Sequence, residues 1–417
     1  MDAVAVAEIK SRRDFYDAFQ AAMSGAHDTL RTLWHFEKGQ NLPKSYLIEF
    51  HPSDVCENGW GTEAVFSALR LTTKRHAAEL GRTNDDTLFW MRHGPGHEAA
   101  FVIDCLNPRF LIFHTLSKVE HSDRFIVDIL TQYQPEFDLF WFPVSLLERT
   151  EIREKINGWQ AQFLPLLDVD LPPENRASHE VALSAYQIEA AENEMADFDE
   201  APLEPPARLL HRPRFNIDLE YQYAFETYKK LKEQPDLLPD MPLSAVVAER
   251  IDEDAASYAR ARIFSYGKIT GRGPDFSSYL QIVNNTVDDY AKIVQNLESE
   301  YWIMLEAQQF EDCTQIKLKG KPFCIWFNHE IDVKRLVSLM FDCSRPFRLM
   351  GEPEAIDENY FAVEAVDLHV NQPVGFEITP NFMRIYLYEG TCGNTLVRII
   401  RSLQHSVDSK LKHPALI

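Results

Sequence analysis

The sequence predicts an α+β protein of two domains, each a mixed or mainly antiparallel sheet packed with helices. Three observations lead to this prediction. The chain has 417 residues, more than one hydrophobic core usually supports. Its strand candidates follow one another at short spacings broken by proline and glycine, which favours antiparallel hairpins. An acidic, proline-bearing segment then divides the chain, so we expect domains at 1–167 and 211–417 joined by a linker at 168–210.

The N-terminal domain is expected to mix helices with short apolar strands. Apolar residues near helical spacing predict a helix over 11–35. Thr62 as an N-cap and Gly81 just past the last turn predict a second helix over 62–80, and residues 144–163 are predicted to close the domain as a third. The strands expected between these helices are 45–50, 87–91, 100–104, 109–114 and 137–142.

In the C-terminal domain the predicted helices come first and most strands follow, an order that again indicates α+β. The predicted helices are 218–234, 242–263, 284–299, 331–342 and 394–412. The predicted strands are 301–307, 314–319, 322–327, 360–370, 375–379 and 382–388.

The charge balance excludes several classes of protein. There are 64 Asp and Glu against 42 Lys and Arg, a net charge of −22, whereas a surface that follows nucleic acid throughout needs a basic footprint. The same charge disfavours binding to anionic membranes. No apolar stretch approaches the roughly 20 residues that cross a bilayer, and the N-terminus does not resemble a secretory signal. We therefore expect a soluble cytoplasmic protein that does not bind membranes.

The cysteines give no sign of a metal ribbon or a redox pair. All six stand apart in the sequence, without a C-x-x-C motif. Several lie in apolar runs, where a reduced thiol behaves as a small hydrophobe. This pattern favours a reducing compartment. The six are Cys56, Cys105, Cys313, Cys324, Cys343 and Cys392.

The expected linker has the composition of an extended segment. Between Gln187 and Pro206 there are seven acidic residues, no basic residue and three prolines. Repulsion between like charges and the presence of proline both disfavour compact structure. A plain linker explains the composition; the alternative is an acidic tether that competes with a polyanion for a basic site.

The C-terminal part of the chain contains a candidate anion site at a glycine-bearing turn between a strand and a helix. Such a turn leaves backbone N–H groups free at a helix N-terminus, where anions bind. Gly390, Thr391, Gly393 and Asn394 form the turn, and Arg398 on the helix adds a positive charge. The alternative is an ordinary helix cap, because no P-loop or G-x-G-x-x-G spacing is present.

Polar residues near this turn are candidates for acid–base chemistry or half of a metal site. Asp367 and His369 are two residues apart, so on a strand they face the same side, and a carboxylate beside an imidazole suits proton transfer. Glu377 and His405 complete the candidate catalytic set. The alternative is the polar face that any half-exposed strand presents.

A short basic stretch offers a third kind of site. Residues 267–273 (GKITGRG) contain three glycines and two cations and could approach a phosphate backbone closely. The alternative is a hairpin turn with solvated charges.

These signals support hypotheses of different classes. The first is a non-catalytic binding or scaffold subunit of a cytoplasmic assembly with protein partners, because no catalytic motif stands out. The second is a hydrolase or phosphodiesterase-like enzyme whose C-terminal domain acts on a phosphorylated or nucleotide substrate. The third is nucleic-acid binding through 267–273. The residues do not identify a cofactor or a metal.

Overall fold

The structure is a computed structural model that carries side chains. It describes residues 3–33, 42–51, 60–75, 78–94, 98–131, 135–163, 215–221, 223–233, 242–251, 257–309, 314–414 and 416. The segment expected to be a linker, 168–210, lies outside the described residues.

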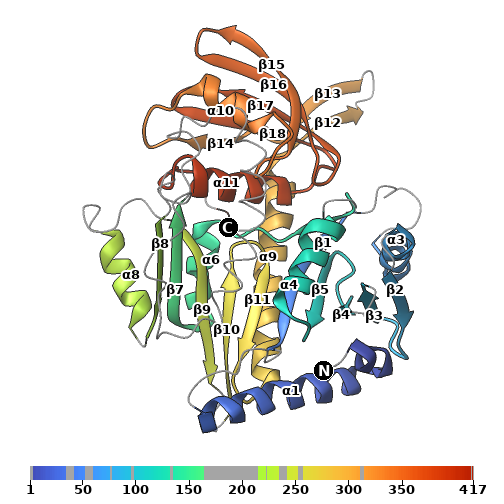
Figure 1. The fold of residues 1–417 in the computed structure, drawn as a ribbon. Coiled ribbons are helices and arrows are strands. Elements are labelled where there is room, and N and C mark those ends of the chain that lie inside the picture. The colour runs from blue at the N-terminus through green and yellow to red at the C-terminus, as the bar shows by residue number, and fades with distance from the viewer. Residues whose placement is uncertain are drawn as a thin grey trace.

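Among the described residues there are two sheets, and the larger contains eleven antiparallel strands (Figure 1). Their order is β2-β3-β4-β5-β1-β11-β10-β9-β7-β8, and β6 pairs with β1 on the side opposite β5. The strands are β1 (Lys44–Phe50), β2 (Ala78–Arg82), β3 (Leu88–His93), β4 (Ala99–Asp104), β5 (Phe110–Thr115), β6 (Phe137–Leu139), β7 (Lys155–Phe163), β8 (Phe215–Glu220), β9 (Leu243–Ile251), β10 (Tyr258–Phe264) and β11 (Lys268–Arg272).

Strand β1 lies at a fork in this sheet. At its start it pairs with β11, through Lys44↔Thr270, Ser45↔Ile269 and Tyr46↔Lys268. Further along, from Ile48 to Phe50, its partner on that side is β6. The turn between β10 and β11 fits into the fork at Gly267. Its φ is +77°, and a Cβ there would lie 2.8 Å from the Phe140 carbonyl oxygen, so a glycine is needed.

Helices cover the ends and one face of the large sheet. In Figure 1, α1 (Arg12–Leu33) crosses below the strands and α9 (Phe276–Tyr301) runs behind them up to the second sheet. The start of α9 is defined by Asp275, whose side chain accepts from the backbone N–H groups of Ser277 and Ser278. The other helices of this unit are α3 (Thr62–Arg75), α4 (Val119–Asp123, continued by a π-helical segment, Arg124–Leu130), α6 (Val144–Arg149) and α8 (Ala224–Lys232).

In the described part of the chain, the smaller sheet has seven strands in the order β13-β12-β18-β17-β16-β15, with β14 paired to β18. Only the β12–β18 pair among its described pairings is parallel. The strands are β12 (Trp302–Gln309), β13 (Thr314–Lys319), β14 (Phe323–Trp326), β15 (Leu349–Asp357), β16 (Tyr360–Asp367), β17 (Gln372–Ile378) and β18 (Phe382–Tyr388). Its helices are α10 (Val333–Met340) and α11 (Asn394–Ser406), and α11 lies between the two sheets (Figure 1).

The predicted fold class is confirmed: the protein is α+β, with two units built on mainly antiparallel sheets. The division between the sheets does not coincide with 168–210. Strands β8 to β11 follow that segment in the chain but pair with β7 and β1, which precede it. The second sheet begins only after α9.

Several predicted helices are strands. Within 242–263, Leu243–Ile251 is β9 and Tyr258 begins β10. Within 144–163, α6 occupies the start, and Lys155–Phe163 is β7. The predicted helix 62–80 ends at Arg75, and residues from Ala78 onward form β2. The helix predicted over 218–234 is shorter, because β8 occupies its start. In each case pairing with a neighbouring strand outweighs the local helical preference of Ala, Glu, Lys and Arg.

The basic stretch 267–273 is not an exposed turn, so the hypothesis that it binds nucleic acid is wrong. Most of it is β11, in the middle of the large sheet. Lys268 is fully buried, and its Nζ lies 3.2 Å from the Asp123 carboxylate. A buried, paired lysine cannot neutralise a phosphate backbone.

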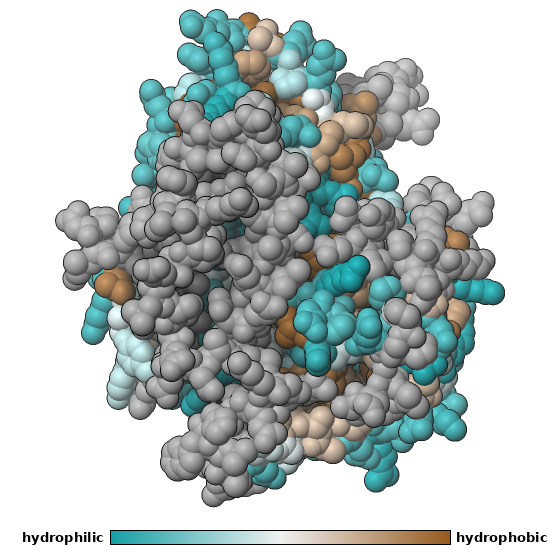
Figure 2. Space-filling view, in the orientation of Figure 1, coloured by the Kyte–Doolittle hydropathy of each residue, from teal (hydrophilic) through white to brown (hydrophobic). Residues whose placement is uncertain are grey.

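The described surface is mostly hydrophilic on the face drawn in Figure 2, and its apolar residues form small separate groups. In the part of the chain that the structure covers, no helix combines the length and the apolar composition that a membrane span requires.

Candidate functional site

Helix α11 is the element around which the candidate site is built. All but one of its residues are buried, although the sequence contains many polar side chains. These side chains are used to join the two sheets. Towards the small sheet, Thr395 donates to Asp367 at 2.6 Å. Towards the large sheet, Arg401 donates to the Ser265 hydroxyl at 3.0 Å, and Gln404 accepts from the Val144 backbone N–H at 3.0 Å.

The turn before α11, predicted to bind an anion, has partners inside the protein. The N–H of Cys392 donates to the Gln372 side chain at 2.7 Å, and that of Gly393 donates to the Glu298 carboxylate at 2.9 Å. The N–H of Asn394 lies 3.2 Å from the Cys392 sulfur. The positive end of the helix therefore faces an internal carboxylate, Glu298.

Of the remaining residues of the predicted turn, Gly393 and Thr391 serve structural contacts. A Cβ at Gly393 would lie 2.8 Å from the Val294 carbonyl oxygen, so the glycine permits the turn to approach α9 closely. Thr391 donates to the Pro373 carbonyl at 3.0 Å. Gly390, with a φ of +87°, has open space around it.

Arg398 is fully buried and forms an ion pair with Asp367, which is also fully buried. Nη1 of Arg398 donates to the Phe347 carbonyl at 2.7 Å, and Nε of Arg398 lies 3.7 Å from the Asp138 carboxylate. Arg398 thus binds the protein's own acids and holds the loop before β15 against α11.

The four predicted catalytic residues are not brought together. Asp367 faces Arg398, whereas His369 follows the end of β16 and faces Asp138. Glu377 pairs with Arg384 at 2.8 Å on the open face of the small sheet. His405 is buried on the other side of α11, with Nδ1 3.2 Å from the Gln162 carbonyl.

His369 and Asp138 form a buried pair that no sequence motif indicates. Nδ1 of His369 lies 3.3 Å from Asp138 Oδ1, and its Nε2 has no hydrogen-bond partner among the described residues. Burial alone raises the pKa of Asp138, but charge and hydrogen-bond interactions with His369, followed by Arg398, lower the net pKa to about 2. Burial, with help from Arg398, lowers the pKa of His369. The carboxylate is therefore ionised at neutral pH.

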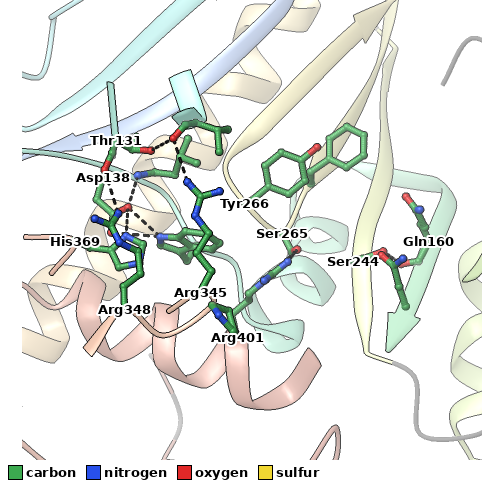
Figure 3. A pocket seen from close by; sticks show the side chains of 16 residues that line it. Thr131, Asp138, Gln160, Ser244, Ser265, Tyr266, Arg345, Arg348, His369 and Arg401 are labelled. Atoms are coloured by element: carbon green, nitrogen blue, oxygen red, sulfur yellow. Dashed lines mark hydrogen bonds and ion pairs between the residues drawn. The ribbon is translucent and has the colours of Figure 1, made fainter. Parts of the chain in front are cut away.

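This pair lies on the wall of a cavity of about 90 Å³ between the large sheet and α11 (Figure 3). That volume is several times the roughly 10–15 Å³ needed to hold one water molecule. The polar residues that line it are Thr131, Asp138, Gln160, Gln162, Ser244, Ser265, Tyr266, Arg345, Arg348, His369 and Arg401, and the apolar ones are Val127, Leu139, Trp141, Phe264 and Pro346.

Positive charge dominates this lining. Among the described residues, the lining contains three arginines, Arg345, Arg348 and Arg401, and one carboxylate, that of Asp138. Figure 3 shows the arginines and His369 on one side, with Ser244 and Gln160 across from them. Arg348 has a φ of +49°, an uncommon conformation for a residue with a side chain, and burial lowers the pKa of its guanidinium. An anion in the cavity would stabilise these cations.

A second buried cluster lies where β1 ends against the turn before α11. The Cys392 sulfur is 3.0 Å from His51 Nε2 and 3.4 Å from Glu49 Oε1, and those two atoms are 3.6 Å apart. Arg109 donates to Glu49 at 2.8 Å and to Glu298 at 2.9 Å. The possible ligand atoms of Glu49, His51 and Cys392 all lie within 4.8 Å of one another, close enough to bind one metal ion together.

Burial changes the proton affinities in this cluster. It is the main cause that raises the pKa of Glu49 to about 7 and lowers that of His51 to about 3. Burial, followed by the charge of Glu49, also raises the pKa of the Cys392 thiol well above its usual value. Without a bound cation, Cys392 is therefore a neutral thiol beside a neutral imidazole.

One hydrogen-bonded network connects the two clusters. The Tyr290 hydroxyl lies 3.4 Å from Glu49 and 2.6 Å from the side-chain oxygen of Asn394. The Asn394 amide nitrogen donates to Asp138 at 3.0 Å. Glu49 and Asp138 are direct neighbours across the β1–β6 pair. Thus a change at one cluster has a short polar path to the other.

Comparison with known proteins identifies the family. The family model described as MJECL33-like protein matches the chain over residues 3–199 and 196–414. The chain belongs to the MJECL33-like family. It is 24% identical over 420 residues to the uncharacterized protein MJECL33 of Methanocaldococcus jannaschii, a match that spans 97% of this chain and 94% of that protein. No solved structure was found to match it.

Neither family description states an activity, so the function of this MJECL33-like protein has to be argued from its two clusters. Sequence reasoning found His369, Asn394 and the turn containing Cys392, but not their partners. A partial signal existed in SYLIEFH, where Glu49 and His51 alternate with apolar residues at the end of a strand. Charged and titratable side chains in such a strand are seldom buried without a partner.

Proposed function

We propose that the protein is a cytoplasmic binding protein, without catalytic activity, whose ligand is a small phosphorylated molecule held in the cavity beside α11. The observation that carries this proposal is the lining of three arginines and a histidine against one carboxylate. In a protein with a net charge of −22, three partly buried arginines beside a neutral histidine favour an anionic ligand.

The chemistry of the lining favours a phosphate group. Guanidinium groups donate several N–H bonds in a planar fork that matches phosphate oxygens. Trp141 adds an aromatic surface, and the Arg401 guanidinium lies 5.4 Å from the centre of its ring. Across the cavity, Ser244 and Gln160 offer hydroxyl and amide groups to the remainder of the ligand. A phosphate joined to a polar or aromatic group would use both sides.

We expect phosphate-bearing probes to bind the full chain, and Arg348→Ala to weaken that binding about 10- to 100-fold. A hydrogen bond to a charged group contributes about 1.5–3 kcal/mol, and about 1.4 kcal/mol is tenfold in affinity. Inorganic phosphate, pyrophosphate and a nucleoside monophosphate are compared by calorimetry and thermal melting at low ionic strength.

Arg384→Ala is the matched control, because Arg384 is half-exposed, pairs with Glu377 and does not line the cavity. It should leave the affinity unchanged. An equal loss in both variants, or no binding of any probe, would contradict the proposed ligand. Unfolding of each apoprotein is measured in parallel to separate binding from stability.

A second candidate function, hydrolysis of a phosphorylated substrate, is favoured by one observation. His369 Nε2 lacks a hydrogen-bond partner among the described residues, and its ring lines the cavity beside Asp138. Because burial keeps this imidazole neutral, it would act as a general base on a water molecule.

If the protein is such an enzyme, His369→Asn should lower turnover of a phosphate ester about 100-fold or more while binding changes little, since general-base catalysis contributes roughly 10²–10⁴. Phosphate release by wild type and variant gives the measurement. If the wild-type protein releases no phosphate above background, hydrolysis is excluded and only the binding function remains.

The expected protein partner stays a prediction. Leu305 and Leu318, register partners on the β12–β13 hairpin, are 72% and 62% exposed. An apolar pair of this kind suits a protein contact better than solvent, and the hairpin lies at one edge of the small sheet.

A further inference from the structure

We propose that Glu49, His51 and Cys392 bind a divalent transition metal ion, with Zn²⁺ as the best fit. This site is distinct from the arginine cavity, and the two proposals are independent. All three side chains are buried, and their donor atoms lie within 4.8 Å of one another.

The geometry suits tetrahedral coordination. Zinc binds thiolate sulfur at about 2.3 Å and imidazole nitrogen or carboxylate oxygen at about 2.0–2.2 Å, so that neighbouring donor atoms are separated by roughly 3.4–3.6 Å. The observed separations are 3.4 Å for Cys392 Sγ to Glu49 Oε1, 3.6 Å for Glu49 Oε1 to His51 Nε2, and 3.0 Å for Sγ to Nε2. Only the last pair has to open, by about half an ångström.

The chemistry of the three donors also favours zinc. A thiolate, an imidazole and a carboxylate together suit Zn²⁺, whereas Mg²⁺ and Ca²⁺ prefer oxygen donors alone. Three protein ligands leave a fourth position for water or another donor, the arrangement of zinc sites that perform chemistry. No other His, Cys, Asp or Glu of the described residues joins this group.

The charges around the cluster leave room for a divalent cation. With Cys392 as a thiolate, Glu49, Glu298 and Cys392 contribute three negative charges, and Arg109 contributes one positive charge. A divalent cation neutralises the remaining net charge of the cluster. A carboxylate oxygen has two lone pairs, so Glu49 Oε1 can bind the metal while it accepts from Arg109. Arg109 then orients the ligand, as outer-shell partners commonly do.

The ligands come from opposite ends of the chain. Glu49 and His51 are alternate residues at the end of β1, so their side chains lie on the same side, and Cys392 belongs to the turn before α11. A bound metal would therefore fasten the large sheet to the helix that joins both sheets. Trp60 packs edge-on to His51 with ring centres 6.0 Å apart and covers this side of the cluster.

The test uses the full chain, stripped of metal with a chelator and titrated with Zn²⁺ or Co²⁺. We expect about one equivalent of metal to bind, Co²⁺ to give a thiolate charge-transfer absorption band, and Zn²⁺ to slow alkylation of Cys392 by iodoacetamide, followed by peptide mapping. These three readings use the wild-type protein, so they do not depend on a variant that folds.

Variants add a second line of evidence. Cys392→Ala and His51→Gln should weaken metal binding by more than the roughly 10- to 100-fold that loss of an outer-shell partner causes. Cys105→Ala, which changes another buried cysteine, should leave metal binding unchanged. The proposal is overturned if the wild type takes up neither metal, if Co²⁺ gives no thiolate band, or if Cys105→Ala loses the metal equally. Fast alkylation of Cys392 that needs His51, with no metal bound, would instead assign a nucleophile–base pair.

Discussion

Arg398→Met is expected to lower the free energy of unfolding by about 3–5 kcal/mol. The substitution leaves Asp367 fully buried without its cationic partner, and the loss of one member of a buried ion pair has effects of this size. It also removes the donor to the Phe347 carbonyl. Urea denaturation of wild type and variant, followed by fluorescence, gives the difference.

The small sheet offers a matched control for this prediction. Arg384 and Glu377 form an ion pair of the same chemistry, but their side chains are 44% and 23% exposed. Arg384→Met should therefore change stability by about 0–1 kcal/mol. The double variant Asp367→Leu/Arg398→Met should lose less than the two single variants together, because neither charge remains unpaired. A loss below about 1 kcal/mol for Arg398→Met would show that the buried pair does not hold α11 in place.

Protonation of His114 by itself is expected to lower the free energy of unfolding by about 3 kcal/mol as the pH decreases from 7 to 4. Burial lowers the pKa of His114 from 6.5 to about 4; nearby Asp104 opposes and Arg12 assists this effect. Between these values the unfolded chain binds a proton that the folded protein does not. The stabilisation is complete above pH 6.5 and is lost progressively down to about pH 4. At 1.36 kcal/mol for each pH interval of one, the difference amounts to the stated loss.

His114→Gln should remove this part of the pH dependence. The wild-type imidazole accepts or donates at 2.9 Å with Ser45, a bond that the amide can retain. His51 and His405, whose pKa values burial also lowers, should supply a remaining slope of the same sign. His329→Gln, at an exposed position, is the control. Denaturation at several pH values measures the slope, and an unchanged slope in His114→Gln would exclude His114 as its source.

The elements predicted well from the sequence are those in which local pattern and tertiary environment agree. Strand β18 alternates in burial along FMRIYLY, as the pattern predicts, and α1 has a clear apolar face. Residues 242–263 show the opposite case. Their Ala, Glu and Arg content favours helix locally, but β9 lies between β7 and β10, and the segment from Leu243 to Val247 is buried as a strand. The partners that decide this outcome lie far away in the sequence.

The candidate site was predictable only in part for the same reason. The sequence places Asp367, His369 and Arg398 near the turn at 390–394 along the chain, and in the structure Asp367 and Arg398 form an ion pair. It does not indicate that Asp138 pairs with His369, or that Glu298 occupies the helix N-terminus. Those partners belong to strands and helices that only the folded chain brings alongside α11.

The short junction between β1 and β11 has a consequence for how the chain folds. Its residues are separated by more than 220 positions, from Tyr46 to Lys268, so this contact has a very high sequence separation, and such contacts form slowly. At a synthesis rate of about 5–20 residues per second, β1 waits on the order of tens of seconds on the ribosome before β11 exists. During that interval the start of β1, which β11 later pairs, is an open edge of a nascent sheet, a known template for aggregation. Chaperone contact with residues 44–46 of the nascent chain, released once β11 has emerged, is therefore the expected course of biosynthesis.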